Sequence, residues 1–144
     1  MSLRVDTIRR VYELFNQLPA DVHARRASPV TEELLGLFTT DVEFTQPAMQ
    51  PEGAQSFSGR EELRASWDQW FEMWEQHRTS LEEVIERENR LLVLSTESFR
   101  GREGVELEQR TGSIFVFRGA QIARFEAFFD RDTAQIEFER LTRA

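Results

Sequence analysis

The chain has 144 residues and a formal net charge of −8, and every basic residue is an arginine. This acidic balance argues against nucleic acid and anionic membranes as partners, and the absence of cysteine excludes disulfides, thiolate metal sites and a cysteine nucleophile. The length fits a single domain over residues 1–144, and no apolar run is long enough for a membrane span or a signal core. A cytoplasmic location is therefore expected.

The chain opens with apolar residues at helical spacing over 3–18, and Pro19 is expected to end this first helix. The polar segment 20–29 is predicted to be a loop. A second helix is predicted over 29–38, with Ser28 as its N-cap and a proline at its first position.

The segment 39–50, "TTDVEFTQPAMQ", predicts a strand that ends at proline. Val42, Phe44 and Gln46 alternate onto one face of that strand. The following residues, 48–59, contain proline and two glycines and are predicted to form a loop.

Ser58 and Glu61 have the spacing of a capping box, which predicts the start of a third helix that runs to about Gln76. Its apolar residues follow one stripe, which is typical of core packing. The stripe contains Leu63, Trp67, Trp70, Phe71 and Trp74.

From Ser80 onward the apolar period becomes strand-like, and short turns divide the segment into four strands. Short turns between consecutive strands predict an antiparallel meander. The predicted turns lie at 88–89, 102–104 and 119–120. A final helix is predicted over 131–141, with Asp130 as its N-cap, so the fold class is α+β with helices covering one face of a sheet.

This order of elements resembles the nuclear transport factor 2-like superfamily, and the local sequence is similar to its SnoaL-like branch. The segments that carry the resemblance are "IRRVYELFNQ", "LLGLFTTDVEF", "FSGREELRASWDQWF" and "VELEQRTGSIFVFRGAQIARFEAFFDR". The resemblance implies a cone, in which three to four helices wrap one side of a curved antiparallel sheet. It also implies a homodimer through the outer face of the sheet, where alternation places Glu106, Glu108 and Arg110.

The resemblance also implies where catalytic groups would lie. Ketosteroid isomerases of this superfamily use a tyrosine on the first helix, which matches Tyr12 here. Their catalytic base matches Gln46, whose amide cannot take a proton from carbon at neutral pH. Their protonated oxyanion-hole aspartate matches Ser113, which can donate a hydrogen bond but is a weaker acid. The aspartate that cyclases and limonene epoxide hydrolase carry on the last strand matches Ala127. The usual acids of these enzymes are therefore expected to be absent.

Two residues remain as catalytic candidates, Tyr12 and Glu97. Glu97 shares a strand face with Phe99, so it could act as a general acid or base if that face is concave. The alternative is a carboxylate at the rim of the sheet, paired with an arginine. Tyr12 is either a proton donor or a core residue with its hydroxyl at the edge of a pocket.

We expect a pocket that binds a small apolar molecule, because aromatic residues and a few polar groups converge on the inside of such a cone. Its predicted residues are Tyr12, Phe44, Gln46, Trp67, Phe71, Gln109, Thr111, Ser113 and Phe129. The alternatives are a divergent isomerase, lyase or hydrolase that uses Glu97 or Tyr12, and a non-catalytic dimeric accessory module.

The two histidines do not suggest a metal site. His23 is predicted in a loop and His77 at a helix end, and no carboxylate stands at ligand spacing to either of them. Neither a metal nor another cofactor is therefore expected.

Overall fold

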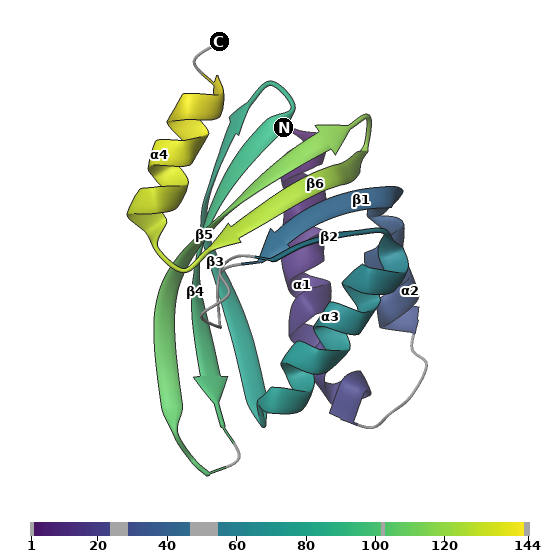
Figure 1. The fold of residues 1–144 in the computed structure, drawn as a ribbon, viewed down its shortest axis with the longest axis vertical. Helices are drawn as coiled ribbons and strands as arrows, with labels where there is room; N and C mark the ends of the chain where they lie inside the picture. Colours follow the sequence, from purple (N-terminus) through teal and green to yellow (C-terminus); the bar gives the residue numbers. More distant parts are fainter. Residues whose placement is uncertain (1, 24–28, 47–54, 102, 143–144) are drawn as a thin grey trace.

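The computed structural model of the chain describes residues 2–23, 29–46, 55–101 and 103–142, without the side chains at 19–23, 46 and 55. Within these residues one curved six-stranded sheet has the strand order β2-β1-β6-β5-β4-β3 (Figure 1). The strands are β1 (Phe38–Gln46), β2 (Gln55–Ser58), β3 (Gln76–Arg87), β4 (Arg90–Arg100), β5 (Glu106–Arg118) and β6 (Gln121–Phe128).

The predicted α+β class and the antiparallel meander of the last four strands are confirmed. The sheet as a whole is mixed, however, because β1 pairs with β6 in parallel. A hairpin turn sets the relative direction of the strands that it joins, whereas β1 and β6 are separated by most of the chain. No local signal in the sequence therefore reports their direction.

Four helices pack on the sheet, and it separates two hydrophobic cores (Figure 1). The helices are α1 (Leu3–His23), α2 (Pro29–Gly36), α3 (Arg60–Met73) and α4 (Arg131–Thr142). The first three cover the concave face, as predicted, and α4 lies on the opposite face. None of the described helices is long and apolar enough to span a membrane.

The core beneath α4 is small and depends on a close approach between helix and sheet. Ala134 and Phe138 of α4 pack onto Leu92 and its neighbours in β4 and β5. A Cβ atom added at Gly112 would lie 2.6 Å from the Cβ of Ala134, so only glycine allows the helix to sit this close. Asp130 caps α4 as predicted, accepting hydrogen bonds from the Asp132 amide and the Thr133 hydroxyl.

The first helix does not end at Pro19 but continues to His23. Proline fixes φ at about −65°, which is itself a helical value, so a helix can pass through it although one backbone hydrogen bond is lost. The predicted loop over 20–29 therefore begins later, and the proposed N-cap Ser28 lies outside the described residues. Pro29 does occupy the first position of α2, which ends at Gly36 rather than at residue 38.

The expected loop over 48–59 contains the short strand β2, which pairs antiparallel with β1. The capping box is also wrong in detail. Gly59 is the N-cap of α3 and makes no side-chain hydrogen bond, while the Ser58 amide donates to Glu62 Oε2 at 2.9 Å. Glutamates occupy both 61 and 62, so the pattern alone could not select the bonded one.

The third helix ends at Met73, three residues before its predicted end, and β3 begins at Gln76 rather than at Ser80. This correction changes the role of His77. It belongs to a strand instead of a helix end, and its side chain is buried on the concave side of the sheet.

Candidate functional site

A cavity of about 200 Å³ lies between the concave face of the sheet and the helices α1 and α3. Most of its wall is aromatic. The aromatic lining consists of Tyr12, Phe15, Phe38, Trp67, Trp70, Phe99, Phe115, Phe125, Phe128 and Phe129. Such a wall favours a flat, mostly apolar occupant.

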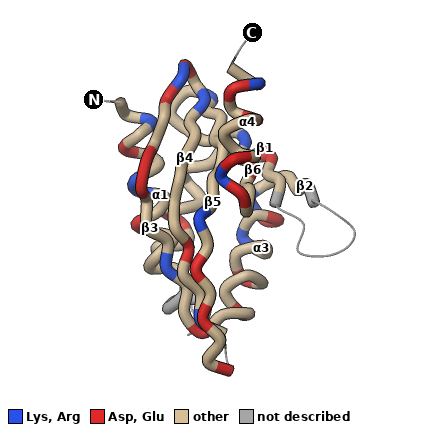
Figure 2. The backbone as a smooth tube through the Cα atoms, turned by 90° about the vertical axis from the view of Figure 1, so that its left-hand side faces the viewer, with Lys and Arg blue, Asp and Glu red and all other residues tan. Residues whose placement is uncertain are grey.

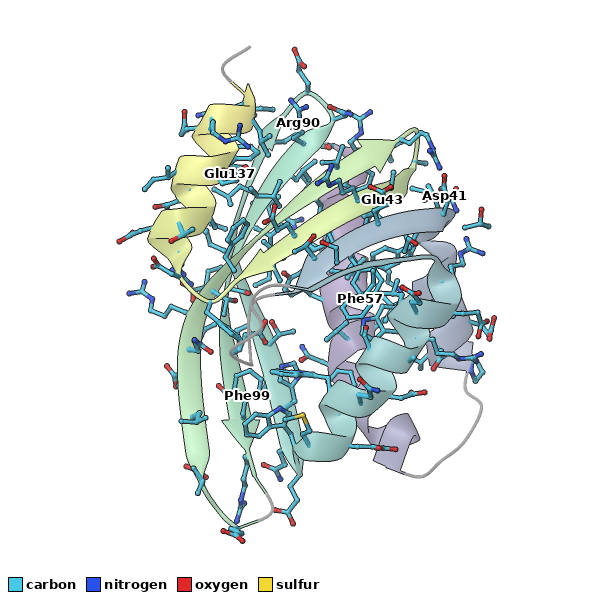
Figure 3. The ribbon with its side chains drawn as sticks, in the orientation of Figure 1. Asp41, Glu43, Phe57, Arg90, Phe99 and Glu137 are labelled. Carbon is cyan, nitrogen blue, oxygen red and sulfur yellow. The ribbon has the colours of Figure 1, made fainter. Side chains whose placement is uncertain are left out.

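Helical spacing explains the roof of the cavity. Tyr12 and Phe15 lie three residues apart on α1, and Trp67 and Trp70 have the same spacing on α3, so each pair shares a face. The Phe15 and Trp67 rings meet edge to face with centroids 5.8 Å apart. Figure 3 shows Phe99 pointing from β4 toward α3, where its ring packs against Trp70 at 5.5 Å.

Strand register explains the polar floor of the cavity. Thr79, Glu97 and Gln109 are direct cross-strand partners on β3, β4 and β5, and all three line the cavity. In the next row, the hydroxyls of Ser95 and Thr111 lie 3.0 Å apart. The floor thus presents a carboxylate, an amide and hydroxyls in a compact group.

Glu97 lies inside the cone and is not a rim carboxylate paired with an arginine. Its Oε1 accepts a hydrogen bond from Thr79 Oγ1, and its Oε2 lies 3.0 Å from His77 Nε2. The side chain of Glu97 is 19% exposed and that of His77 only 3%. Of the two open alternatives for Glu97, the structure supports the one in which its strand face is concave.

Sequence reasoning missed His77, because the third helix was predicted to run to about Gln76, which placed His77 at a helix end instead of in a strand. Its ring stacks on Phe99 at 4.8 Å and lies 5.3 Å from Phe71. Its Nδ1 is buried, with no hydrogen-bond partner among the described residues. Burial alternates along this part of β3, with His77 and Thr79 inside, but both residues are polar, so the sequence shows no apolar alternation that would mark a strand here.

Asn16 of α1 fixes this part of β3 in place. Its Nδ2 donates to the Thr79 carbonyl at 2.9 Å, and the Thr79 amide donates to its Oδ1 at 2.8 Å. The Thr79 backbone therefore points away from β4, which makes Thr79 and Glu97 a non-hydrogen-bonded pair with closely spaced side chains. This spacing brings the Thr79 hydroxyl to the Glu97 carboxylate.

Tyr12 is poorly suited to give up its proton. Burial raises the pKa of its hydroxyl well above the usual value, and the nearby Glu97 charge raises it further. Hydrogen bonding with Ser95 and Ser113 opposes the rise only in part. Near neutral pH, Tyr12 therefore keeps its proton and acts as a hydrogen-bond donor or acceptor.

A family model for the SnoaL-like domain matches residues 8–127 of the chain. The chain belongs to the SnoaL-like family. Among curated proteins, none matches it.

Solved structures similar to this SnoaL-like chain share its fold. A nuclear transport factor 2-like protein of unknown function from Burkholderia pseudomallei is 25% identical over 100% of both chains, with a TM-score of 0.73. TerC, co-crystallised with polyporic acid, is 19% identical over 99% of this chain and 100% of its own, with a TM-score of 0.72. A protein with a ketosteroid isomerase-like fold from Catenulispora acidiphila is 12% identical over 74% and 80%, with a TM-score of 0.61.

The SnoaL-like cone brings together most of the residues that the sequence singled out. Those that line the cavity are Tyr12, Trp67, Glu97, Gln109, Thr111, Ser113 and Phe129. Phe44 and Phe71 do not line it but are buried in the main core, and the Gln46 side chain lies outside the described residues. Ala127 also lines the cavity. Among the described residues, no group of three or more potential ligands is placed to hold a metal ion.

Proposed function

We propose that this SnoaL-like protein binds a small, mostly aromatic molecule in its cone cavity. The observation that supports the proposal is the cavity of about 200 Å³, with an aromatic wall and a polar floor that includes Glu97 and Gln109. Aromatic rings supply the apolar contact area, and the few polar groups would fix the orientation of the ligand.

The size of the cavity supports a ligand of about one ring. An apolar cavity of about 150 Å³ holds benzene, whereas pockets for drug-sized ligands are about 300–1,000 Å³. A molecule with four fused rings would therefore need the helices to move. A single ring with a short polar substituent fits without rearrangement.

Filling the cavity tests the proposal. Ala127 lies in the cavity wall, and Ala127→Leu adds bulk there without adding a polar group. Titration of the whole chain with benzyl alcohol, followed by NMR, is expected to show saturable shifts of cavity residues in the parent protein. In Ala127→Leu the affinity is expected to fall at least about tenfold, because a loss of about 1.4 kcal/mol suffices for that change.

The matched control is Ala65→Leu, which adds the same atoms at an exposed position on α3 and should leave the affinity unchanged. Equal binding by Ala127→Leu and the parent protein would place the ligand elsewhere and reject the proposal. If both variants unfold at the same temperature as the parent protein, a difference in affinity cannot be attributed to loss of folding.

A catalytic role is the second candidate, and Glu97 is the residue that favours it. Its carboxylate reaches the cavity, and its hydrogen bonds with Thr79 and His77 would hold it in one orientation. A carboxylate placed beside a bound molecule can transfer a proton, as an isomerase, lyase or hydrolase requires. The alanine in the cavity wall at 127, where related cyclases carry an aspartate, leaves Glu97 as the proposed acid–base group.

If turnover of a small aromatic substrate is found, Glu97→Gln is expected to lower kcat at least about a hundredfold, since general acid–base catalysis typically contributes that much. Tyr12→Phe should have a smaller effect, because Tyr12 keeps its proton and can contribute only hydrogen bonds. Unchanged kcat in Glu97→Gln would leave the non-catalytic binding module as the better account.

A homodimer through the outer face of the sheet is also part of this proposal. Below the area that α4 covers, charged residues gather along the lower parts of β4 and β5 (Figure 2). Glu106, Glu108 and Arg110 are exposed there, close to Arg100 on the neighbouring strand, so two copies could pair opposite charges. Light scattering should give twice the 16.9 kDa mass of one chain; a monomer mass would contradict it.

A further inference from the structure

The charged groups of the cavity are unequally accessible to a ligand. Among the described lining residues, Glu97 is the only carboxylate and no arginine is present. The one basic group, His77, is 3% exposed at its side chain, with Nε2 directed at Glu97 and Nδ1 enclosed. The Glu97 side chain is 19% exposed, so the charge that a ligand meets is negative.

Glu97 has capacity for further hydrogen bonds. A carboxylate offers about four acceptor sites on its two oxygens, and the contacts with Thr79 and His77 occupy one on each oxygen. Its cross-strand neighbour Gln109 also lines the cavity and can supply an amide oxygen as another acceptor. This end of the cavity can therefore receive a group with several N–H donors.

The surrounding rings favour the same sign of charge. The face of an aromatic ring is electrically negative and attracts a cation that lies within about 6 Å of its centre. Trp70 and Phe99 line the cavity on the side of Glu97, with their rings packed against each other. The Phe99 ring is stacked on His77 and packed against Trp74. A positive group beside Glu97 would therefore meet the carboxylate and, of the two rings that line the cavity here, Trp70.

We propose that the natural ligand class of this cavity is a compact arylalkyl amine, whose ammonium group binds at Glu97 and whose ring fills the aromatic part. This inference rests on the proposed binding of a small aromatic molecule and specifies in addition that the ligand carries a positive charge. A ligand carboxylate would face Glu97 without an arginine to receive it.

Three probes of nearly equal size test the inference on the full chain at neutral pH, by calorimetric titration. They are phenethylammonium, the neutral phenethyl alcohol and phenylacetate. We expect phenethylammonium to bind at least about tenfold more tightly than the alcohol, because a hydrogen bond between two charged groups is stronger than one made by a neutral hydroxyl. Phenylacetate should bind more weakly than both.

Glu97→Gln is expected to reduce the affinity for phenethylammonium to about that for the alcohol. The matched control is Glu61→Gln, which removes the same charge from an exposed position on α3 and should preserve the order of the three probes. The comparison in the parent protein needs no variant, so poor folding of Glu97→Gln would not remove the test.

The outcomes separate this inference from the binding proposal. If the alcohol binds in the cavity but phenethylammonium binds no more tightly, or phenylacetate binds as well, the charge preference is overturned and the apolar site stands. A preference that survives Glu97→Gln overturns the role of Glu97. If phenethylammonium alone binds, the charge preference stands, but apolar contact is not the main driving force for binding. If none of the three probes binds, both the binding proposal and the charge preference are overturned.

Discussion

Phe44→Ala is expected to lower the free energy of unfolding by about 3–5 kcal/mol, the usual cost of removing a buried aromatic side chain. Phe44 is 1% exposed. Its ring is stacked between Phe57, at 5.1 Å, and Phe125, at 5.3 Å with an interplanar angle of 9°. Both neighbours belong to strands paired with β1, so the space left by the ring cannot close without moving the sheet.

Urea denaturation followed by tryptophan fluorescence would measure this change. The control is Ile136→Ala, which removes an apolar side chain that is 71% exposed on α4 and should cost less than about 0.5 kcal/mol. If Phe44 formed part of the cavity wall, as the sequence predicted, its removal would enlarge an existing space and cost less. A loss below about 1 kcal/mol would therefore contradict the core position.

The parts of the fold that depend on residues close together in the sequence could be predicted. The last four strands could be located because alternation marks each strand and short turns join them, for example at Gly119, which has a φ of 65°. Asp130 caps α4 through contacts within three residues. The parallel pairing of β1 with β6 depends on segments far apart in the chain, and the sequence pattern carries no information on it.

Some residues of the candidate site could be predicted from the sequence and others could not. Alternation along β5 placed Gln109, Thr111 and Ser113 on one face, and all three line the cavity. The partner of Glu97 was missed, because the helix was extended a few residues too far and His77 was assigned to its end. Helix ends are poorly marked when no glycine or proline follows them, and here the error concealed His77, the one basic side chain among the described residues of the cavity wall.

His77 and Glu97 form the second feature with a large expected effect. His77→Ala should lower the free energy of unfolding by about 3 kcal/mol, since it removes a buried ring that stacks on Phe99 and also the hydrogen-bond partner of a partly buried carboxylate. His77→Phe keeps an aromatic ring in the same cage and removes only the polar contact. Its cost should therefore be smaller, about 1.5 kcal/mol, the lower end of the range for hydrogen bonds to charged groups.

A double-mutant cycle with His77→Phe and Glu97→Gln would isolate the contribution of the pair. If the two side chains depend on each other, the second substitution should cost at least about 0.5 kcal/mol less in the presence of the first than alone. Additive effects would mean that Thr79 and the backbone of β4 hold Glu97 without His77. In that case the imidazole would serve only to fill the aromatic cage, and substitutions of Glu97 could be interpreted without reference to it.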